Sequence, residues 1–451
     1  MSLTLEAFRP RGIAIVGASS DPASLGHRPF GYLARTGYTG QIYPVNPNRD
    51  SIAGWRCYPD LASVPDPVDH AMISVAAARV PAALADCAAR GIALATLLSS
   101  GVAADVTPPD GLRVIGPNSM GFFNAHDGVA ATWNSALDLD RIPAGPVALI
   151  AQSGGLGGAV LNRLVDRGVG VGYTFWSGEE RFVDTTEYLE MLLDEPRISV
   201  VVLLIEGIRN AGRFLELARA YQRRGKPLVA YKLARAAQSR EAALAHSGIL
   251  TGERRVQQAA FQQFGIIEAA DVDELCDHAA LLSMSREPMG DHLAAVTTSG
   301  GAGILISDVA EGLGLRLPTL DGRVQETLRA ILPSYATIAN PLDVTAGLPE
   351  DTVMAALRTL ARDPGVDVVL KVNTMIGGAA RLSARAEALI ENTPSLGKPL
   401  LSVWLGGSLS DGGREILRQA GVPHFISVEG CLRAVSAAAA WHRRRTTALQ
   451  N

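Results

Sequence analysis

Cysteines, charged residues and long hydrophobic runs are all scarce in this sequence. Only four of the 451 residues are cysteines, and they lie far apart with no CxxC pair, which argues against a zinc site or a disulfide framework. The 41 Lys and Arg against 45 Asp and Glu give a net charge of −4, which is too balanced to predict a nucleic-acid surface. The longest uncharged stretch, residues 142–162, holds two prolines and five glycines, so it predicts no membrane span.

Apolar residues and glycine, in contrast, are abundant. Apolar residues make up 47% of the chain, enough for several buried cores, and the charged share of 19% lies below the usual ~25%, which excludes a disordered or fibrous chain. At a prior of about 150 residues per domain, the length predicts roughly three domains. The first residues lack the apolar core of a signal peptide, so we expect a cytoplasmic globular protein.

Short β-branched runs alternate with Ala- and Leu-rich amphipathic stretches along the whole chain. The runs predict buried strands at residues 12–17, 69–75, 198–206, 226–232 and 366–372. The stretches at 79–91 and 211–225 predict helices. Strands that are apolar on both faces and separated by helices predict an α/β protein, with parallel sheets covered on both sides.

Three segments repeat one pattern, in which an apolar strand runs into a Gly/Ser turn and then a helix. They are IAIVGASS (13–20), VALIAQSGGLGG (147–158) and LAAVTTSGGAG (293–303). The same order of further strands follows the second and third segments, which predicts a repeated domain of about 150 residues after a different first domain. We expect linkers near residues 125–145 and 285–292.

The three glycine turns are candidate phosphate sites. A helix N-terminus presents unpaired N–H groups and glycine lets an anion approach them, although tight strand-to-helix turns prefer glycine for structural reasons as often. Three such turns in one chain favour anionic ligands. A nicotinamide dinucleotide is disfavoured, because the first turn lacks GxGxxG and the second strand ends in Val45 and Asn46 instead of an acid.

As an ordered set, these segments resemble the nucleoside-diphosphate-forming acyl-CoA synthetases, the superfamily of succinyl-CoA synthetase. The resemblance covers nearly the whole chain and is carried by IAIVGASSDP, GPNSMGFFN, QSGGLGGAV, AHSGILTG, TSGGAG and IANPLDV. It implies a CoA-binding Rossmann-like domain at residues 1–130, followed by two flavodoxin-like ligase domains with parallel sheets at 145–285 and 292–446. The family's ATP-grasp module is missing, so the resemblance implies an α-subunit.

The resemblance also implies catalytic roles. His246, in the loop AHSGILTG, would be the phosphorylated histidine, and Glu206 at the end of a buried strand would hold its other ring nitrogen. By residue type alone, an ordinary loop histidine and a solvated acid are the alternatives. Two helix starts would face the phosphohistidine and stabilise the transferred phosphate. Their residues are Gln152, Ser153, Gly154 and Gly155 on one helix, and Ser299, Gly300 and Gly301 on the other.

For CoA, the resemblance points to strand ends of the first domain. The residues are Gly17, Ala18, Ser19, Ser20, Asn46, Pro47, Ser74, Ser99, Ser100, Gly101, Pro117 and Asn118. Arg49 is a candidate for a CoA phosphate, with an ordinary exposed arginine as the alternative. Loops 99–105 and 177–184 depart from the family's pattern, and Trp176 beside the second loop is either a residue of the acyl pocket or packing.

The resemblance therefore implies the α-subunit of an ADP-forming acid–CoA ligase, which works through phosphohistidine and acyl phosphate. ATP or ADP and Mg²⁺ would come through an ATP-grasp β-subunit, in a hetero-oligomer or homodimer. The further substrate is a carboxylic acid, and we expect no metal site, nucleic acid or membrane contact. Two alternatives remain: a non-catalytic CoA- or acyl-CoA-binding regulatory subunit, and an ATP-independent phosphate-linked acyl or carbamoyl transferase.

Overall fold

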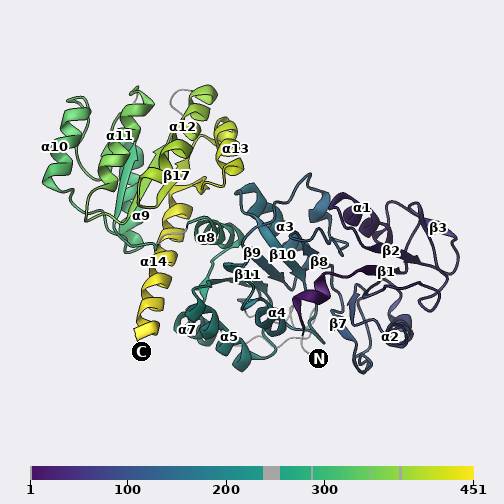
Figure 1. The fold of residues 1–451 in the computed structure, drawn as a ribbon. Helices are drawn as coiled ribbons and strands as arrows, with labels where there is room; N and C mark the ends of the chain where they lie inside the picture. Colours follow the sequence, from purple (N-terminus) through teal and green to yellow (C-terminus); the bar gives the residue numbers. More distant parts are fainter. Residues whose placement is uncertain (1–2, 237–253, 286–287, 346, 375–377, 451) are drawn as a thin grey trace. The chain divides into compact units, whose positions relative to one another are not determined.

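The protein forms two compact units, drawn in Figure 1. The computed structural model describes residues 3–236, 254–285, 288–345, 347–374 and 378–450. Unit 1 is Met1–Val165 with Gly170–Glu268, and unit 2 is Asp166–Val169 with Ala269–Asn451. Unit 1 contains two main sheets and unit 2 contains one. The alternation of strands and helices confirms the predicted α/β class.

The first sheet is parallel and has the strand order β2-β1-β5-β6-β7. Its central strands are almost wholly buried, as expected of a sheet covered on both faces. The strands are β1 Gly12–Val16, β2 Gln41–Val45, β5 His70–Ile73, β6 Leu94–Leu97 and β7 Arg113–Ile115. The connections include helices α1 Arg28–Arg35 and α2 Val80–Ala89, and the small hairpin of β3 Ser51–Ile52 with β4 Trp55–Arg56.

The second sheet has the order β13-β12-β11-β9-β10-β8, and its edge strand β8 runs antiparallel to β10. The other pairs in this sheet are parallel. The strands are β8 Gly121–Asn124, β9 Val147–Ala151, β10 Val171–Trp176, β11 Val200–Ile205, β12 Leu228–Lys232 and β13 Ile267–Glu268. The helices are α3 Gly154–Asp166, α4 Thr185–Leu192, α5 Ala211–Arg224 and α7 Arg254–Gln263.

The sheet of unit 2 is parallel and has the order β15-β14-β16-β17-β18. Its strands are β14 Leu293–Thr297, β15 Leu342–Asp343, β16 Val368–Asn373, β17 Leu400–Trp404 and β18 His424–Phe425. The helices of this part are α8 Val272–Met284, α9 Gly300–Gly312, α10 Gly322–Ile331, α11 Glu350–Ala361, α12 Gly378–Asn392, α13 Asp411–Gln419 and α14 Val428–Gln450.

The second and third sheets share one strand order, which confirms the predicted repeat. The run β13-β12-β11-β9-β10 corresponds to β18-β17-β16-β14-β15. In the second sheet Leu204 pairs with Ala151, and in the third Val372 pairs with Thr297. The Ser-Gly-Gly turns begin two residues after Ala151 and Thr297, respectively. Two residues after their pairing partners Leu204 and Val372 lie Glu206 and Thr374, which therefore occupy equivalent positions.

The expected linker at 125–145 is wrong in its first part. Strand β8 pairs with β10, and isolated bridges join β8 to residues 129–132. Trp133 is fully buried, and Asn134 donates from Nδ2 to the carbonyl of Gly154 at 2.8 Å. The segment lacks periodicity because it packs irregularly along the sheet edge and the start of α3, and not because it is exposed.

The domain boundaries stay a proposal. Helix α8 lies within the expected second domain of residues 145–285, yet it belongs to unit 2, where it packs against α14. The two compact units therefore divide the chain differently from the three predicted segments 1–130, 145–285 and 292–446. The difference arises because the first two sheets are in contact, with the ring of Phe122 on β8 against that of His70 on β5, whereas α8 packs on α14 of unit 2.

The interiors of both units are apolar. The four cysteines lie there as free, buried thiols, and burial raises the pKa of Cys87 to about 12, as expected of packing residues. In the parts of the chain that the structure describes, no helix is long and apolar enough to cross a lipid bilayer.

Candidate active site

The expected CoA residues all follow strands of the first sheet at its carboxyl end. They lie after β1 (17–20), β2 (46–47), β5 (74), β6 (99–101) and β7 (117–118). Because the strands are parallel, these loops gather along one sheet edge, where open α/β sheets bind their ligands. Ser20, Pro47, Ser100 and Gly101 are exposed there, whereas Ala18 and Pro117 are buried.

Hydrogen bonds hold the first two of these loops together. Asn46 donates from Nδ2 to the carbonyl of Ala18 at 2.8 Å. The guanidinium of Arg49 donates from Nε to the hydroxyl of Ser20 at 3.2 Å. The exposed Arg49 therefore brings a cation to the β1 loop, where an anionic ligand would meet it.

The first glycine turn is not a helix N-terminus, so that expectation is wrong. After Gly17 the chain forms a loop and a short 3-10 turn before α1 begins at Arg28. Gly17 has a φ of +83°, and a Cβ there would lie 2.3 Å from the carbonyl oxygen of Ser74. Glycine is thus required by backbone conformation and packing, and the assignment of this turn to CoA stays a prediction.

The two loops that depart from the family's pattern contact each other. Arg181 donates from its guanidinium to the carbonyls of Val102 at 3.1 Å and Ala103 at 2.9 Å. The N–H of Glu179 donates to the carbonyl of Pro117 at 3.0 Å, at the cis Gly116–Pro117 bond. Loops 99–105 and 177–184 therefore form one surface beside the end of β7.

The second glycine turn is a helix N-terminus, since α3 begins at Gly154 directly after the β9 turn. A Cβ at Gly154 would lie 2.6 Å from Cγ of Met120, and one at Gly157 would lie 2.5 Å from Cβ of Ala151. These two glycines are needed for packing. No described atom lies within 4 Å of a Cβ at Gly155, so Gly155 leaves space for an anion beside the first N–H groups of the helix.

Gln152 and Glu206 lie together at the ends of adjacent strands. Oε1 of Gln152 accepts from the backbone N–H of Glu206 at 2.5 Å and of Gly207 at 3.1 Å. Its Nε2 donates to the carbonyl of Gly207 at 2.8 Å and to Glu180 at 2.8 Å. Because these bonds use the whole amide, the Gln152 side chain holds the end of β11. Its expected phosphate-binding role stays a prediction.

Sequence reasoning misses Glu180, which is 1% exposed. Burial raises the pKa of its carboxyl, and hydrogen bonds from Thr185, Ser177 and Gln152 oppose that rise. The available signal was weak: two successive acids in a turn flanked by a serine and a threonine, which supply its donors.

Two other expectations concern Trp176 and His246. Trp176 is fully buried, and its ring lies 3.0 Å from where a Cβ at Gly157 would be, so it is packing and not a pocket residue. His246 lies within residues 237–253, outside the described residues, and its role stays a prediction.

The third glycine turn is also a helix N-terminus, with Ser299 immediately before α9. The N–H of Ser299 donates to the hydroxyl of Thr297 at 3.2 Å. A Cβ at Gly300 would lie 3.4 Å from Oδ2 of Asp343, and one at Gly301 would lie 3.8 Å from the Ser299 hydroxyl. Neither glycine is tightly packed, so the start of α9 is accessible to an anion.

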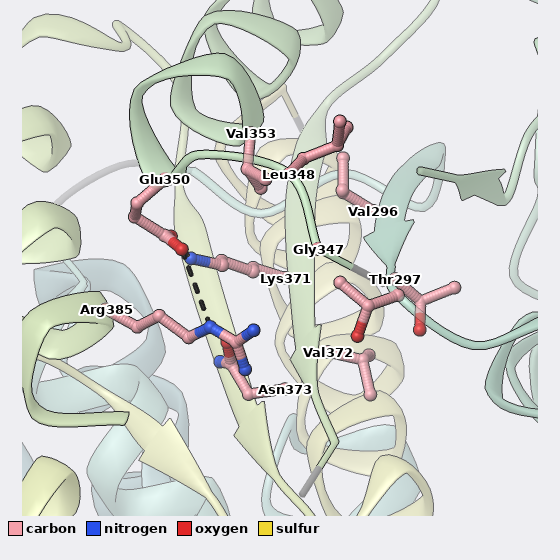
Figure 2. Close-up of a pocket in the computed structure, with 11 residues that line it drawn as sticks. Val296, Thr297, Gly347, Leu348, Glu350, Val353, Lys371, Val372, Asn373 and Arg385 are labelled. Atoms are coloured by element: carbon pink, nitrogen blue, oxygen red, sulfur yellow. Dashed lines mark hydrogen bonds and ion pairs between the residues drawn. The ribbon is translucent and has the colours of Figure 1, made fainter. Parts of the chain in front are cut away.

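A small cavity in unit 2 lies beside this turn and is lined by Thr297 among others (Figure 2). Its volume is about 10 Å³, which is room for one water molecule. Lys371 and Arg385 are both buried and both face Glu350. The carboxylate of Glu350 forms an ion pair with Lys371, and its Oε2 lies 3.5 Å from Nε of Arg385. Burial lowers the pKa of the Lys371 ammonium below its usual value. The nearby carboxylate of Glu350 opposes this shift only in part. One terminal nitrogen of Arg385 is buried with no hydrogen-bond partner among the described residues.

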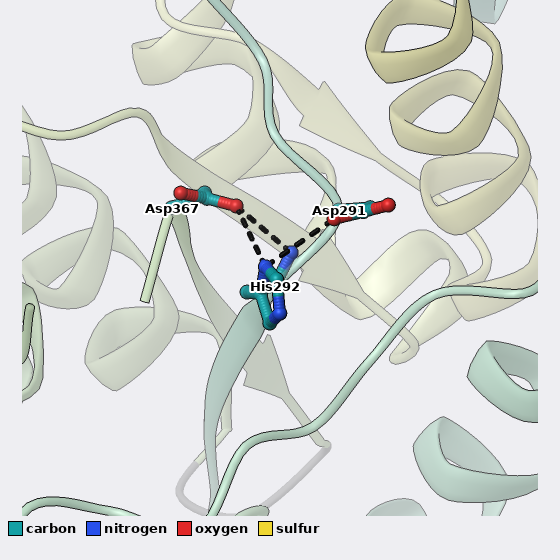
Figure 3. A group of neighbouring side chains, drawn as sticks. All are labelled: Asp291, His292 and Asp367. Carbon is teal, nitrogen blue, oxygen red and sulfur yellow. Dashed lines mark hydrogen bonds and ion pairs between the residues drawn. The ribbon is translucent and has the colours of Figure 1, made fainter. Parts of the chain in front are cut away.

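Figure 3 shows a further group of titratable side chains, at the amino end of β14. Nδ1 of His292 lies 3.2 Å from Asp367 and 3.3 Å from Asp291, and the His292 N–H donates to Asp367 at 3.1 Å. Asp291 also pairs with Arg443 at 2.8 Å. These contacts tie the strand start to its neighbours, and we assign no metal to the group.

Comparison with protein families defines the class of this fold and site. Three family models match successive parts of the chain: a CoA binding domain at residues 11–125, a succinyl-CoA ligase like flavodoxin domain at 144–282 and a ligase-CoA domain at 293–447. The chain is thus a CoA ligase component with the architecture of the succinyl-CoA ligases.

Individual relatives narrow this class. The chain is 30% identical to the α-subunit of ADP-forming acetate–CoA ligase II of Pyrococcus furiosus, over 95% of this chain and 96% of that one. It is 30% identical to ADP-forming acetate–CoA ligase I of Archaeoglobus fulgidus, of which it spans 62%. The structure of dinucleotide-forming acetyl-coenzyme A synthetase 1 of Candidatus Korarchaeum cryptofilum, in complex with phosphate and ADP, matches 100% of this chain and 99% of that one, with a TM-score of 0.89 and 28% identity. The chain belongs to the ADP-forming acyl-CoA synthetases.

Proposed function

We propose that this chain is the α-subunit of a ligase that joins a carboxylic acid to CoA and releases ADP. The end-to-end similarity to chains named as α-subunits supports this function. The geometric observation that carries it is the bond from the backbone N–H of Glu206 to Oε1 of Gln152, which places Glu206 beside the turn before α3. A carboxylate beside a helix start suits an imidazole that carries a phosphoryl group, because one binds the ring and the other the phosphate.

The reaction has three balanced steps. A ring nitrogen of His246 attacks the γ-phosphorus of ATP, the N–P bond forms and ADP leaves. An oxygen of the carboxylic acid then attacks the phosphorus, which frees the histidine and forms an acyl phosphate. The CoA thiolate attacks the acyl carbon, the thioester forms and inorganic phosphate leaves. Covalent intermediates of this kind divide a difficult displacement into easier ones.

The described residues serve these steps by binding and orientation. Glu206 holds the second ring nitrogen of His246 and fixes its tautomer. The start of α3, with Gly155, stabilises the negative charge of the phosphoryl group. CoA lies along the loops at the carboxyl end of the first sheet, where Arg49 attracts its phosphates.

We propose an ATP-grasp β-subunit as the partner, which supplies the sites for ATP and Mg²⁺. The names of the Pyrococcus furiosus relatives as α-subunits support a second subunit. A stretch of 175 residues is 32% identical to succinate–CoA ligase subunit beta of Chelativorans sp., which supports a shared ligase architecture in this part. The carboxylic acid stays open.

A second candidate function is a regulatory subunit that binds CoA or acyl-CoA without catalysis. The observation that favours it is the contact of Arg181 with Val102 and Ala103, which joins the two departing loops beside the expected acyl site. The presence of both His246 and Glu206 favours the ligase.

The experiment combines the chain with an ATP-grasp partner, ATP, CoA and a panel of carboxylic acids, and measures ADP release and acyl-CoA. We expect at least one acid to give both products, and His246→Asn to lower the rate by at least about 1,000-fold while CoA binding is unchanged. Tight CoA binding with no product from any acid would support the regulatory subunit. Formation of acyl phosphate from acyl-CoA without labelling of His246 would support the transferase.

A further inference from the structure

Glu180 is a buried carboxylate on left-handed backbone, in the turn between β10 and α4. Its φ is +51°, a region that side chains other than glycine rarely adopt. Oε1 accepts from the hydroxyls of Ser177 at 2.7 Å and Thr185 at 2.6 Å, and Oε2 accepts from the N–H of Thr185 at 3.1 Å. These three bonds are local, and by themselves they only hold the turn.

The fourth bond leaves the turn and reaches Gln152, whose Nε2 donates to Oε2 of Glu180 at 2.8 Å. A carboxylate only accepts, so it requires the Nε2 end of the amide to face it. Oε1 of Gln152 then faces the N–H groups of Glu206 and Gly207, where an amide turned the other way would set donors against donors. Glu180 therefore fixes the direction of the Gln152 amide together with the carbonyl of Gly207, which accepts from the same Nε2 at 2.8 Å.

The carbonyl of Glu206 is also bound by a side chain. Lys232, buried at the end of β12, donates from Nζ to the carbonyl of Glu206 and, at 2.7 Å, to that of Leu233. The strand end that carries Glu206 thus lies between a fixed amide and a buried ammonium. Such accuracy matters in catalysis, since a misplacement of about 1 Å costs about 100-fold in rate.

We propose that Glu180 is a positioning residue that acts through Gln152 to place Glu206 for phosphoryl transfer to and from His246. The inference rests on the function proposed above, in which Glu206 orients the imidazole. Glu180 acts on the rate of phosphoryl transfer and not on the affinity for CoA, because its own bonds run to Gln152, Ser177 and Thr185. The contacts of its loop with Pro117 and with loop 99–105 are made by Glu179 and Arg181 instead.

Two variants of Glu180 separate this role from simple stability. Glu180→Gln keeps an oxygen for Gln152 and for the N–H of Thr185, while its NH₂ donates to hydroxyls that can accept, so we expect labelling of His246 within about threefold of wild type. Glu180→Met removes the acceptor that directs Gln152, and we expect labelling about 30-fold slower with KM for CoA unchanged. Glu195→Met is the matched control, because Glu195 is a buried acid of the same unit that bonds Arg197. We expect that control to lose stability and keep the wild-type labelling rate.

Rates of His246 labelling are measured with the ATP-grasp partner at a temperature where each variant still binds CoA. The double variant Gln152→Ala with Glu180→Met should be no slower than the slower single variant, because the two residues act in series. Labelling of Glu180→Met at the wild-type rate overturns the inference, and so does Glu180→Gln that is as slow as Glu180→Met. Absence of labelling in the wild type overturns the proposed function instead, and the inference falls with it.

Discussion

The second and third sheets have the same strand order and the same Ser-Gly-Gly turn, yet they place polar groups differently at the turn. In the second sheet, the residue before the turn is Gln152, which bonds the peptide of Glu206. In the third, the equivalent residue is Thr298, whose hydroxyl lies 3.1 Å from that of Thr374, the equivalent of Glu206. In both sheets a side chain before the turn reaches the end of the neighbouring strand, through the backbone in the second sheet and through a hydroxyl in the third. Only the second sheet has a carboxylate at the equivalent position.

The third sheet instead has buried charged side chains near the carboxyl end of β16, before the chain reaches Thr374. Lys371 on β16 and Arg385 on α12 share Glu350, so this region carries two cations and one anion (Figure 2). The repeated scaffold thus supplies two helix starts that suit phosphate and one acid that suits the chemistry of histidine. Under the proposed function, we therefore expect phosphoryl transfer at the second sheet and phosphate binding alone at the third.

The largest effect on stability is expected from Glu350→Ala in the third sheet. Removal of this acid leaves two buried cations without their partner, which costs about 3–5 kcal/mol in the free energy of unfolding of unit 2. Calorimetry of the separate melting transitions measures it. A variant in which Glu350→Leu is combined with Lys371→Met and Arg385→Leu is the control, and it should recover most of the loss. An unchanged melting temperature in Glu350→Ala alone would show that the charges are solvated.

The next effect separates packing glycines from ligand glycines in the second sheet. Gly157→Ala sets a Cβ 2.5 Å from that of Ala151 and 3.0 Å from the ring of Trp176, so we expect a loss of about 3 kcal/mol in the stability of unit 1. Gly155→Ala meets open space and should leave stability within about 0.5 kcal/mol while it slows phosphoryl transfer. Thermal unfolding and labelling rates measure the two effects. Equal stability losses in both variants would remove the distinction.

The comparison of the sheets is tested directly by substitution of the two equivalent residues. Glu206→Gln should lower the rate of His246 phosphorylation by about 100-fold, since it removes the carboxylate that orients the ring. Thr374→Val at the equivalent position of the third sheet should change the rate less than about twofold, because it removes only a hydroxyl pair. ADP release with the partner present measures both. Similar losses in the two variants would mean that both sheets take part in the chemistry.

The smallest effect is the pH dependence of each unit. Burial lowers the pKa of His70 in unit 1 to about 3 and that of His278 in unit 2 to about 4. Both lie below the value of about 6.5 in an unfolded chain, so unfolding takes up protons below pH 6.5 and stability falls as the pH falls towards 4. At pH 5 each group should cost about 2 kcal/mol relative to pH 7. In the variant His70→Gln, unit 1 should lose the contribution of His70 to the pH dependence of its stability, while unit 2 keeps that of His278. An unchanged pH profile of unit 1 in this variant would contradict burial of a neutral His70 ring.

Much of the fold follows from the sequence because strands buried on both faces leave a clear local pattern. Strands predicted at 12–17, 198–206 and 366–372 form as β1, β11 and β16, and the repeat of the second and third sheets is confirmed. Edge strand β8 is missed because it is short and pairs with a strand far along the chain. Local pattern carries no information on such partners.

The site is predicted less completely, and for the same reason. The sequence predicts Gln152 and Glu206 as site residues, and the structure places them together. The sequence does not indicate that the Gln152 amide also bonds Glu180, 28 residues away. In the sequence Lys371 is a single charge in an apolar strand. Its partner Glu350 and the neighbouring Arg385 come from two helices, α11 and α12, which the local pattern does not connect with it. Glycine patterns predict the turns and cannot separate Gly155 from Gly157, which only the packing of α3 distinguishes.

The most direct test of the central claim uses this chain alone, without partner or nucleotide. Incubation with acyl-CoA thioesters and labelled inorganic phosphate runs the last two steps backwards: phosphate displaces the CoA thiol, and the acyl phosphate passes its phosphoryl group to His246. We predict an acid-labile label on His246 that is absent from His246→Asn and slower by about 100-fold in Glu206→Gln. A chain that binds the thioesters and acquires no label from any of them would contradict the account.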